Sequence, residues 1–209
     1  FDRVVTAFMY QYPVSELVQA LKYRGNLASA RPLAAGLVSA LDSEPYPDVI
    51  MPMPLAPARL AQRGFNQAME IARRLALEFG LKISSGACHR IHDGTPQASL
   101  PWKQRAANIR GAFVCDFDVG GKTVAVVDDV LTTGATLNEL ARTLKQRGAR
   151  EVIGWIVART PAPGDSRGLL FLCSRNFVQL ACNELLQLRR QLLRLYGTPE
   201  HVACFGGLI

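Results

Sequence analysis

The segment VAVVDDVLTTGAT, residues 124–136, constrains the fold of this chain more than any other feature. Its branched apolar residues predict a buried strand, which ends abruptly in two carboxylates, Asp128 and Asp129. After a short run of small and hydroxyl residues, leucines and an alanine spaced at i, i+3, i+4 and i+7 predict a helix that Gly148 ends. A second apolar run, EVIGWIVA at 151–158, predicts the next strand. This order predicts an α/β fold with a central, mainly parallel sheet that is flanked by helices.

Local patterns predict further elements before this segment, and no internal repeat accompanies them. Capping residues, prolines and apolar spacing predict, in chain order, a helix opened by Ser15 and closed by Gly25, a helix opened by Pro32, a strand within 48–54 closed by prolines, and a helix from Phe65 to Phe79 closed by Gly80. Residues 84–112 are rich in glycine and proline and are predicted to form a loop. The linker-like PAPGDSRG and a leucine-spaced helix follow in a C-terminal appendage, residues 161–209, to which the sequence assigns no role.

The composition indicates a globular protein with a substantial core, because 49% of the 209 residues are hydrophobic and 20% are charged. No apolar run is long enough for a membrane-spanning helix, and no signal segment is evident. The five cysteines form no Cys-x-x-Cys pair, so neither a zinc site nor a disulfide framework is predicted. Cys88, His89 and His92 lie close together, but a surface loop is preferred to a metal site there. We expect a reduced, cytoplasmic protein.

The net charge of +7 comes mostly from one region, residues 59–110. Its nine basic residues are Arg59, Arg63, Arg73, Arg74, Lys82, Arg90, Lys103, Arg105 and Arg110. Such a region suits nucleic acid or a small polyphosphate, although for Arg73, Arg74 and Lys82 a solvated surface is preferred.

Ligands of open α/β sheets bind outside the carboxyl ends of the strands, which is where Asp128 and Asp129 are predicted to lie. Carboxylates suit the two hydroxyls of a ribose, and the backbone N–H groups of residues 132–136, at the start of a helix, suit a phosphate. The pattern therefore favours a ribose 5-phosphate site over the alternative, a capped strand–turn–helix without a ligand. GGKT at 120–123 is no phosphate-binding loop, since Asp116 replaces its first glycine and the motif precedes its strand.

The same residues carry a resemblance to a known family. VAVVDDVLTTGAT resembles the phosphoribosyl pyrophosphate (PRPP) signature of type I phosphoribosyltransferases. The segments YPVSELVQALKYRGN, PMPLAPARLAQRGFNQA and QASLPWKQRAANIRGAF resemble the ComF/GntX group, phosphoribosyltransferase-like proteins associated with competence and DNA utilisation. The resemblance implies the type I fold for a domain over residues 1–160. Members often carry a four-cysteine zinc module upstream, which this chain lacks, and because it begins at Phe1 we expect its true start to be missing.

The resemblance also implies roles for individual residues. Asp128 and Asp129 would hold the ribose hydroxyls, with Mg²⁺ bridging ligand oxygens nearby and no direct protein ligand of the metal. Residues Thr132, Thr133, Gly134, Ala135 and Thr136 would surround the 5-phosphate. The segment from Met51 to Leu55, including Met53 and Pro54, would be the pyrophosphate loop, and Arg59 and Arg63 would neutralise the diphosphate. A mobile loop over residues 90–110 would close over the site and present Arg90, Gln97, Lys103 or Arg105, of which Arg105 and Arg63 are the catalytic candidates.

Three functions remain as hypotheses. The first is a Mg²⁺-dependent phosphoribosyltransferase, a pentosyl-transferring enzyme that moves phosphoribose to a nucleobase-like acceptor. The second is a non-catalytic PRPP-binding protein that assists competence, DNA uptake or the use of external DNA, with that machinery as its partner. The third and least favoured is direct nucleic-acid binding through residues 59–110.

Overall fold

The computed structural model describes residues 1–86, 88–91 and 109–161. The chain divides into two units, Phe1–Phe171 and Leu172–Ile209, and every described residue belongs to the first. The predicted linker and leucine-spaced helix, apart from Pro161, and most of the predicted mobile loop therefore lie outside the described residues. Among the described helices, none has the length and hydropathy needed to cross a membrane.

The described elements alternate between strands and helices along most of the chain. In chain order they are β1 (Arg3–Met9), α1 (Val14–Arg24), the 3₁₀ helix η1 (Leu27–Ser29), α2 (Ala30–Leu41), β2 (Val49–Pro52), α3 (Pro57–Arg63), α4 (Gln67–Phe79), β3 (Cys88–Arg90), β4 (Phe113–Cys115), β5 (Thr123–Leu131), α6 (Ala135–Gln146) and β6 (Glu151–Arg159).

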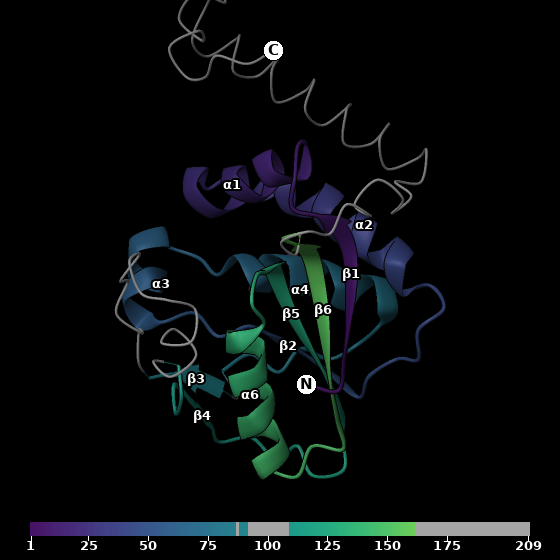
Figure 1. The fold of residues 1–209 in the computed structure, drawn as a ribbon, viewed down its shortest axis with the longest axis vertical. Coiled ribbons are helices and arrows are strands. Elements are labelled where there is room, and N and C mark those ends of the chain that lie inside the picture. Colours follow the sequence, from purple (N-terminus) through teal and green to yellow (C-terminus); the bar gives the residue numbers. More distant parts are fainter. Residues whose placement is uncertain (87, 92–108, 162–209) are drawn as a thin grey trace, which may run out of the picture. The chain divides into compact units, whose positions relative to one another are not determined.

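The larger sheet has the strand order β1-β6-β5-β2, and each of its neighbouring pairs is parallel. Figure 1 shows α6 in front of this sheet and α2 and α4 behind it, so helices cover both faces. This arrangement confirms the predicted α/β fold with a parallel sheet flanked by helices. Because the strands are parallel, their carboxyl ends all lie at one edge, where α1 is also found (Figure 1).

The core forms where β5 and β6 lie between the helices. Leu137, Leu140 and Leu144 of α6 are buried against the valines of β5 and β6, which explains the leucine spacing seen in the sequence. On the opposite face, the Phe79 ring of α4 contacts Trp155 of β6, with 5.8 Å between the ring centroids. The two central strands are therefore packed against helices on both faces, and this packing supports the end of β5.

Several element predictions are confirmed, and five described elements were not predicted: β1, η1, α3, β3 and β4. Strands β2, β5 and β6 and helices α1, α2, α4 and α6 lie where the local patterns placed them. Helix α4 begins at Gln67, two residues later than expected, because the Asn66 side chain accepts hydrogen bonds from the first N–H groups of the helix. Strand β1 was missed because most of its residues are only half-buried, and α3 because it buries no residue at all.

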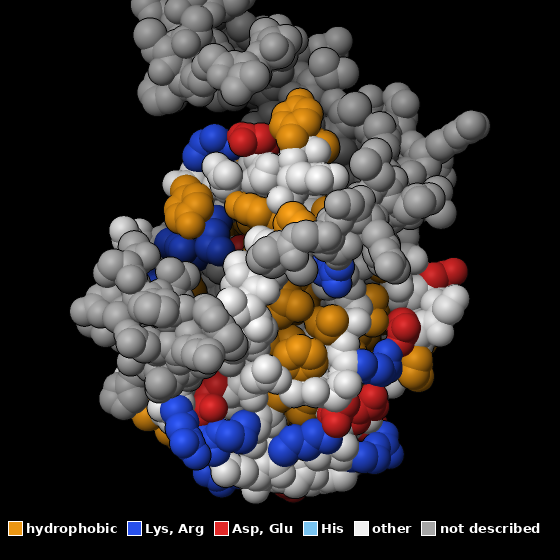
Figure 2. All heavy atoms as spheres, in the orientation of Figure 1, with side chains coloured by type: hydrophobic (Ala, Val, Ile, Leu, Met, Phe, Trp, Pro, Cys, Tyr) orange, Lys and Arg blue, Asp and Glu red, His pale blue; other side chains and the backbone are white. Residues whose placement is uncertain are grey.

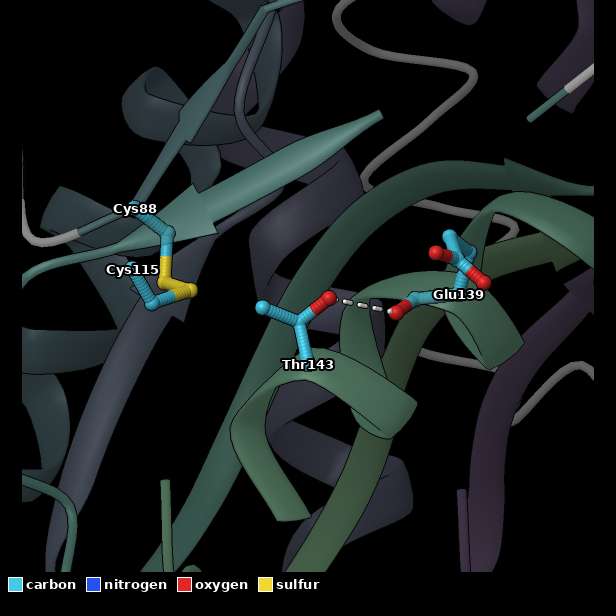
Figure 3. Close-up of a disulfide and its surroundings, with 4 residues drawn as sticks. All are labelled: Cys88, Cys115, Glu139 and Thr143. Atoms are coloured by element: carbon cyan, nitrogen blue, oxygen red, sulfur yellow. Dashed lines mark hydrogen bonds between the residues drawn. A yellow bond between two sulfur atoms is a disulfide. The ribbon is translucent and has the colours of Figure 1, made fainter. Parts of the chain in front are cut away.

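Part of the segment 84–112, which was predicted to be a loop, forms a strand instead. Residues 88–90 form β3, which pairs antiparallel with β4 and places Cys88 directly opposite Cys115. The two cysteines form a disulfide (Figure 3), so the prediction that the cysteines are unpaired is wrong for this pair. The cause is tertiary, since the strand pairing joins residues 27 positions apart in sequence. His89 is exposed, and no group of three or more metal-ligating side chains occurs in the part of the chain that the structure describes.

Helix α6 also contacts the C-terminal end of the 91–112 segment. The Glu139 carboxylate accepts a hydrogen bond from the N–H of Gly111 at 2.6 Å and pairs with Arg142. One turn later, the Thr143 hydroxyl donates to the Glu139 carbonyl at 3.0 Å (Figure 3). Arg142 and the Gly111 N–H both favour the charged carboxylate and lower the pKa of Glu139. Gly111, near the end of this segment, is thus hydrogen-bonded to α6, the helix that follows the candidate phosphate loop Thr132–Thr136.

Candidate functional site

The end of β5 presents two adjacent carboxylates whose environments differ. Successive side chains of a strand point to opposite faces of the sheet, so Asp128 and Asp129 cannot share one face. Asp128 has the parity of Val124 and Val126, which pack on the α6 side, whereas Asp129 points to the side of α1. Asp128 is half-buried, and Asp129 is only 3% exposed. Of the two aspartates, Asp128 is therefore the more accessible to a ligand.

Asp129 is paired with a residue that the sequence analysis did not assign to the site. The Lys22 ammonium of α1 lies 3.0 Å from Oδ2 of Asp129 and 3.4 Å from Oδ1. Oδ1 also accepts a hydrogen bond from the N–H of Val130 at 2.9 Å. A buried carboxylate needs such partners, because an unpaired buried charge costs several kcal/mol. Lys22 follows the buried Val18 by one helical turn, which brings it to the edge of the buried face of α1.

Asp128 is in a less favourable electrostatic position. Burial and then the negative charge of Asp129 raise the pKa of the Asp128 carboxyl well above its ordinary range. The N–H of Asp129, which donates to Oδ1 of Asp128 at 2.9 Å, and the charge of Lys22 both oppose this shift. A group with a raised pKa at the mouth of a site is a candidate for ligand binding. New hydrogen-bond donors near Asp128, such as hydroxyls, would favour its charged form.

The loop after β5 leads directly into a helix. Thr132 and Thr133 are exposed, and Gly134 adopts a left-handed conformation with φ of 75° before α6 begins at Ala135. The Gly134 carbonyl accepts the N–H of Asn138, so this glycine caps the helix. The first N–H groups of an α-helix have no intrahelical partner, and the helix dipole adds positive potential there. The loop Thr132–Thr136 thus has the arrangement expected of an anion site.

The neighbouring strand β2 ends beside β5, just before the two aspartates. The N–H of Met53 donates to the carbonyl of Val127 in β5 at 2.8 Å, so the residues that follow β2 stay beside β5. The Asn66 side chain donates to the Met53 carbonyl at 3.0 Å while it caps α4. Met53 is buried and Pro54 is half-buried. The segment predicted to be the pyrophosphate loop is therefore held at the carboxyl edge, next to the aspartates.

The candidate arginines lie on α3, at the end of β3 or outside the described residues. Arg59 and Arg63 are half-buried, and Arg63 donates to the Gln67 side chain at 2.9 Å. The Arg63 guanidinium also covers the exposed Tyr23 ring of α1, 5.5 Å from its centroid. Figure 2 shows Lys and Arg side chains gathered between α1 and α3. Arg105, Lys103 and Gln97 lie outside the described residues, and Arg90 lies 5.8 Å from the centroid of the Phe113 ring in the β3–β4 pair.

Comparison with known proteins assigns the chain to a family. The family model described as phosphoribosyl transferase domain matches residues 60–167. The DNA utilization protein YhgH of Salmonella typhi is 35% identical over 166 residues, which cover 77% of this chain and 73% of that protein. This chain belongs to the phosphoribosyl transferase domain family. Competence protein F of Haemophilus influenzae is 32% identical over 168 residues, covering 76% of this chain and 73% of that protein.

Within the phosphoribosyl transferase domain family, this chain is thus related to competence and DNA utilisation proteins, as the sequence motifs predicted. A solved structure described as the allosteric regulatory enzyme of purine biosynthesis has a TM-score of 0.44 and 20% identity, over 63% of this chain and 26% of that chain. The match of the family model begins at residue 60, so α1 and Lys22 precede it. The one sequence signal for Lys22 was its place in LKYRG, within a segment that already resembled the ComF/GntX group.

The residues present suit a Mg²⁺ ion that is held mainly by ligand oxygens. Mg²⁺ usually binds one or two carboxylates together with substrate phosphates and waters, in octahedral geometry. Asp128 is the accessible carboxylate, Asp129 is occupied by Lys22, and the described residues contain no cluster of three candidate ligands. An ion carried in with a diphosphate would fit this edge.

Proposed function

We propose that this protein binds PRPP with Mg²⁺ and transfers its phosphoribosyl group to a nucleobase-like acceptor, with release of pyrophosphate. The observation that carries the proposal is the end of β5. There a half-buried carboxylate, Asp128, is followed four residues later by an exposed hydroxyl loop and seven residues later by the start of α6. Asp128 suits the ribose hydroxyls, and the loop suits a 5-phosphate. The two lie only a few residues apart in sequence, so one segment would recognise both parts of a pentose phosphate.

The remaining parts of the ligand have suitable partners at the same edge. The diphosphate would lie at the Met53–Pro54 segment, with Arg59 and Arg63 of α3 supplying positive charge. Mg²⁺ would neutralise the diphosphate and make it a better leaving group. Asp128 would hold and orient the ribose through its hydroxyls while the bond to pyrophosphate breaks. Positive charge then develops on the ribose, and the nearby carboxylates would stabilise it.

A second function rests on the names of the relatives, since proteins at 32% and 35% identity are named for competence and DNA utilisation. In this alternative the same site binds PRPP without transferring it, and the protein assists the uptake or use of external DNA. Direct binding of nucleic acid through residues 59–110 is a third, weaker hypothesis. Binding of that kind requires an affinity that falls steeply with salt concentration.

Calorimetric titration tests the site first. PRPP with Mg²⁺ is titrated into the wild type, Asp128→Asn and the control Asp42→Asn, which changes an exposed aspartate just after α2. We expect binding by the wild type and the control and at least about tenfold weaker binding by Asp128→Asn, because a charge-assisted hydrogen bond contributes about 1.5–3 kcal/mol. Absence of binding by the wild type would exclude both site-based functions.

The same protein is then incubated with PRPP, Mg²⁺ and a panel of purine and pyrimidine bases, and released pyrophosphate is measured. Base-dependent release that Asp128→Asn abolishes supports the transferase. Tight binding of PRPP without release from any base supports the non-catalytic alternative instead.

A further inference from the structure

Lys22 and Asp129 are joined across a long stretch of sequence. Lys22 lies in the last turn of α1 and Asp129 at the end of β5, 107 positions later. The ammonium lies within 3.4 Å of both carboxylate oxygens, and the two side chains are 23% and 4% exposed. At the surface such a pair contributes little, but a mostly buried pair is screened much less by water and salt. The pair therefore fixes the Asp129 carboxylate in one orientation.

The position of this pair next to Asp128 connects it with ligand binding. Two carboxylates on adjacent residues repel each other, and one of them tends to keep a proton when no cation is near. The groups that act electrostatically on Asp128 are Asp129 from its own strand and Lys22 from α1. Lys22 offsets the charge of Asp129 and thereby weakens the repulsion. A protonated Asp128 would be a poorer acceptor for hydroxyl donors than a carboxylate.

The fold supports the lysine in this position. Helix α1 ends at Gly25, whose left-handed conformation directs its N–H to the carbonyl of Ala20. A cation in the last turn is favoured by the negative end of the helix dipole. Arg24, two residues later, is 60% exposed and pairs with Glu16 of the same helix, so it provides a matched comparison without contact to the site.

We propose that Lys22 is a positioning residue of the ribose site, which fixes Asp129 and offsets its charge so that Asp128 accepts the ribose hydroxyls as a carboxylate. The inference rests on the proposed function, because it deepens the role of the same site. The sequence implied the same role for both aspartates, whereas this inference gives each a different one. Asp128 is the main ligand-binding carboxylate, and Asp129 acts on it together with Lys22.

The test compares Lys22→Met, Lys22→Arg and the control Arg24→Met. Affinity for ribose 5-phosphate, which lacks a diphosphate, is measured by calorimetry between pH 6 and pH 9. We expect Lys22→Met to bind about tenfold more weakly at pH 7, because more of Asp128 keeps its proton without the lysine. The deficit narrows as the pH is raised, because Asp128 then loses its proton even without the lysine. Lys22→Arg retains most of the affinity, and Arg24→Met matches the wild type.

Two results would overturn the inference. One is binding by Lys22→Met within about twofold of the wild type at pH 7. The other is a deficit of equal size at every pH that Lys22→Arg does not restore, which would mean only a structural role. Both are read on variants whose thermal unfolding shows a folded protein at each pH.

A ligand-free measurement separates this inference from the proposed function. Carbon-13 NMR follows the carboxyl signals of Asp128 and Asp129 as the pH is changed, in the wild type and in Lys22→Met. A higher titration midpoint for Asp128 in the variant supports the inference even if no sugar phosphate binds. An unchanged midpoint refutes it, even if PRPP binds the wild type well.

Discussion

Replacement of Gly134 by alanine should affect stability and ligand binding in separable ways. Gly134 has a φ of 75°, a conformation that costs an L-residue roughly 1–2 kcal/mol. A Cβ atom at this position would lie 3.4 Å from the Phe1 ring, an ordinary contact, so no steric clash adds to the cost. We therefore expect a loss of about 1–2 kcal/mol, which corresponds to about 2 to 8 °C in Tm for a domain of this size.

Gly148, just beyond the other end of the same helix, provides the matched control. Its φ is 88°, and a Cβ atom there would lie 3.3 Å from Cα of Gly120, so Gly148→Ala should lose at least as much stability. It lies after the end of α6, away from the loop that precedes the helix, and we expect its ligand affinity to be unchanged. Gly134→Ala instead distorts the loop whose N–H groups would face a phosphate. The loss of one hydrogen bond to a charged group weakens binding by about 10- to 100-fold.

Differential scanning calorimetry measures the two Tm values, and isothermal titration with ribose 5-phosphate measures the affinities. The reasoning is refuted if Gly134→Ala binds as tightly as the wild type despite its lower Tm. It is refuted equally if Gly148→Ala loses as much affinity as Gly134→Ala. In the second case the affinity would be following global stability and not the local conformation of the loop.

Three other predictions concern the electrostatics, the disulfide and the packing of the core. Because the pKa of the Asp128 carboxyl is raised in the folded protein, its contribution to stability is present at low pH and lost as the pH increases. Asp128→Asn should therefore have a higher Tm than the wild type at pH 8. Equal Tm values at pH 8 would contradict this. That difference should disappear below about pH 4, where the carboxyl is protonated in both states. Cys88 and Cys115 should resist alkylation in the denatured, unreduced protein, and reduction should cost about 3–4 kcal/mol for a loop of this length; five reactive thiols without reduction would contradict the pairing. Gly154→Ala places a Cβ atom 2.6 Å from a β1 side chain and 2.7 Å from an α6 side chain. Urea unfolding should therefore show a free energy of unfolding that is lower by about 1–3 kcal/mol. An unchanged midpoint would contradict the packing described.

Elements with a strong local pattern could be predicted from the sequence. Strand β5 is a continuous apolar run, and α4 and α6 each bury one face, so their periodicity is present in the residues themselves. Helix α3 begins with a proline and ends at a glycine, but it has no buried residues and so no apolar periodicity to detect. Strand β1 is an edge strand whose residues are mostly half-buried, and neither pattern of burial is clear in it.

The site was predicted where it is contiguous in sequence and missed where it depends on tertiary contacts. The path from Asp128 to the start of α6 is eight residues of one segment, and its chemistry could be inferred directly. The pairing of Lys22 with Asp129 depends on how α1 packs across the end of β5. The same holds for the different exposure of the two aspartates, since the sequence shows two equal carboxylates and only the packing distinguishes them.

The pairing of β1 with β6 has a consequence for synthesis on the ribosome. Arg3 pairs with Ile153, so the first strand finds its partner only after about 150 further residues have been made. At about 5–20 residues per second, β1 remains unpaired for roughly 8 to 30 s. During that time its edge and the neighbouring edge of β5 are both open to other chains, which is a hazard for aggregation. Ribosomes stalled before β6 should therefore carry aggregation-prone nascent chains, whereas those stalled far enough beyond it for β6 to leave the exit tunnel should carry a closed sheet.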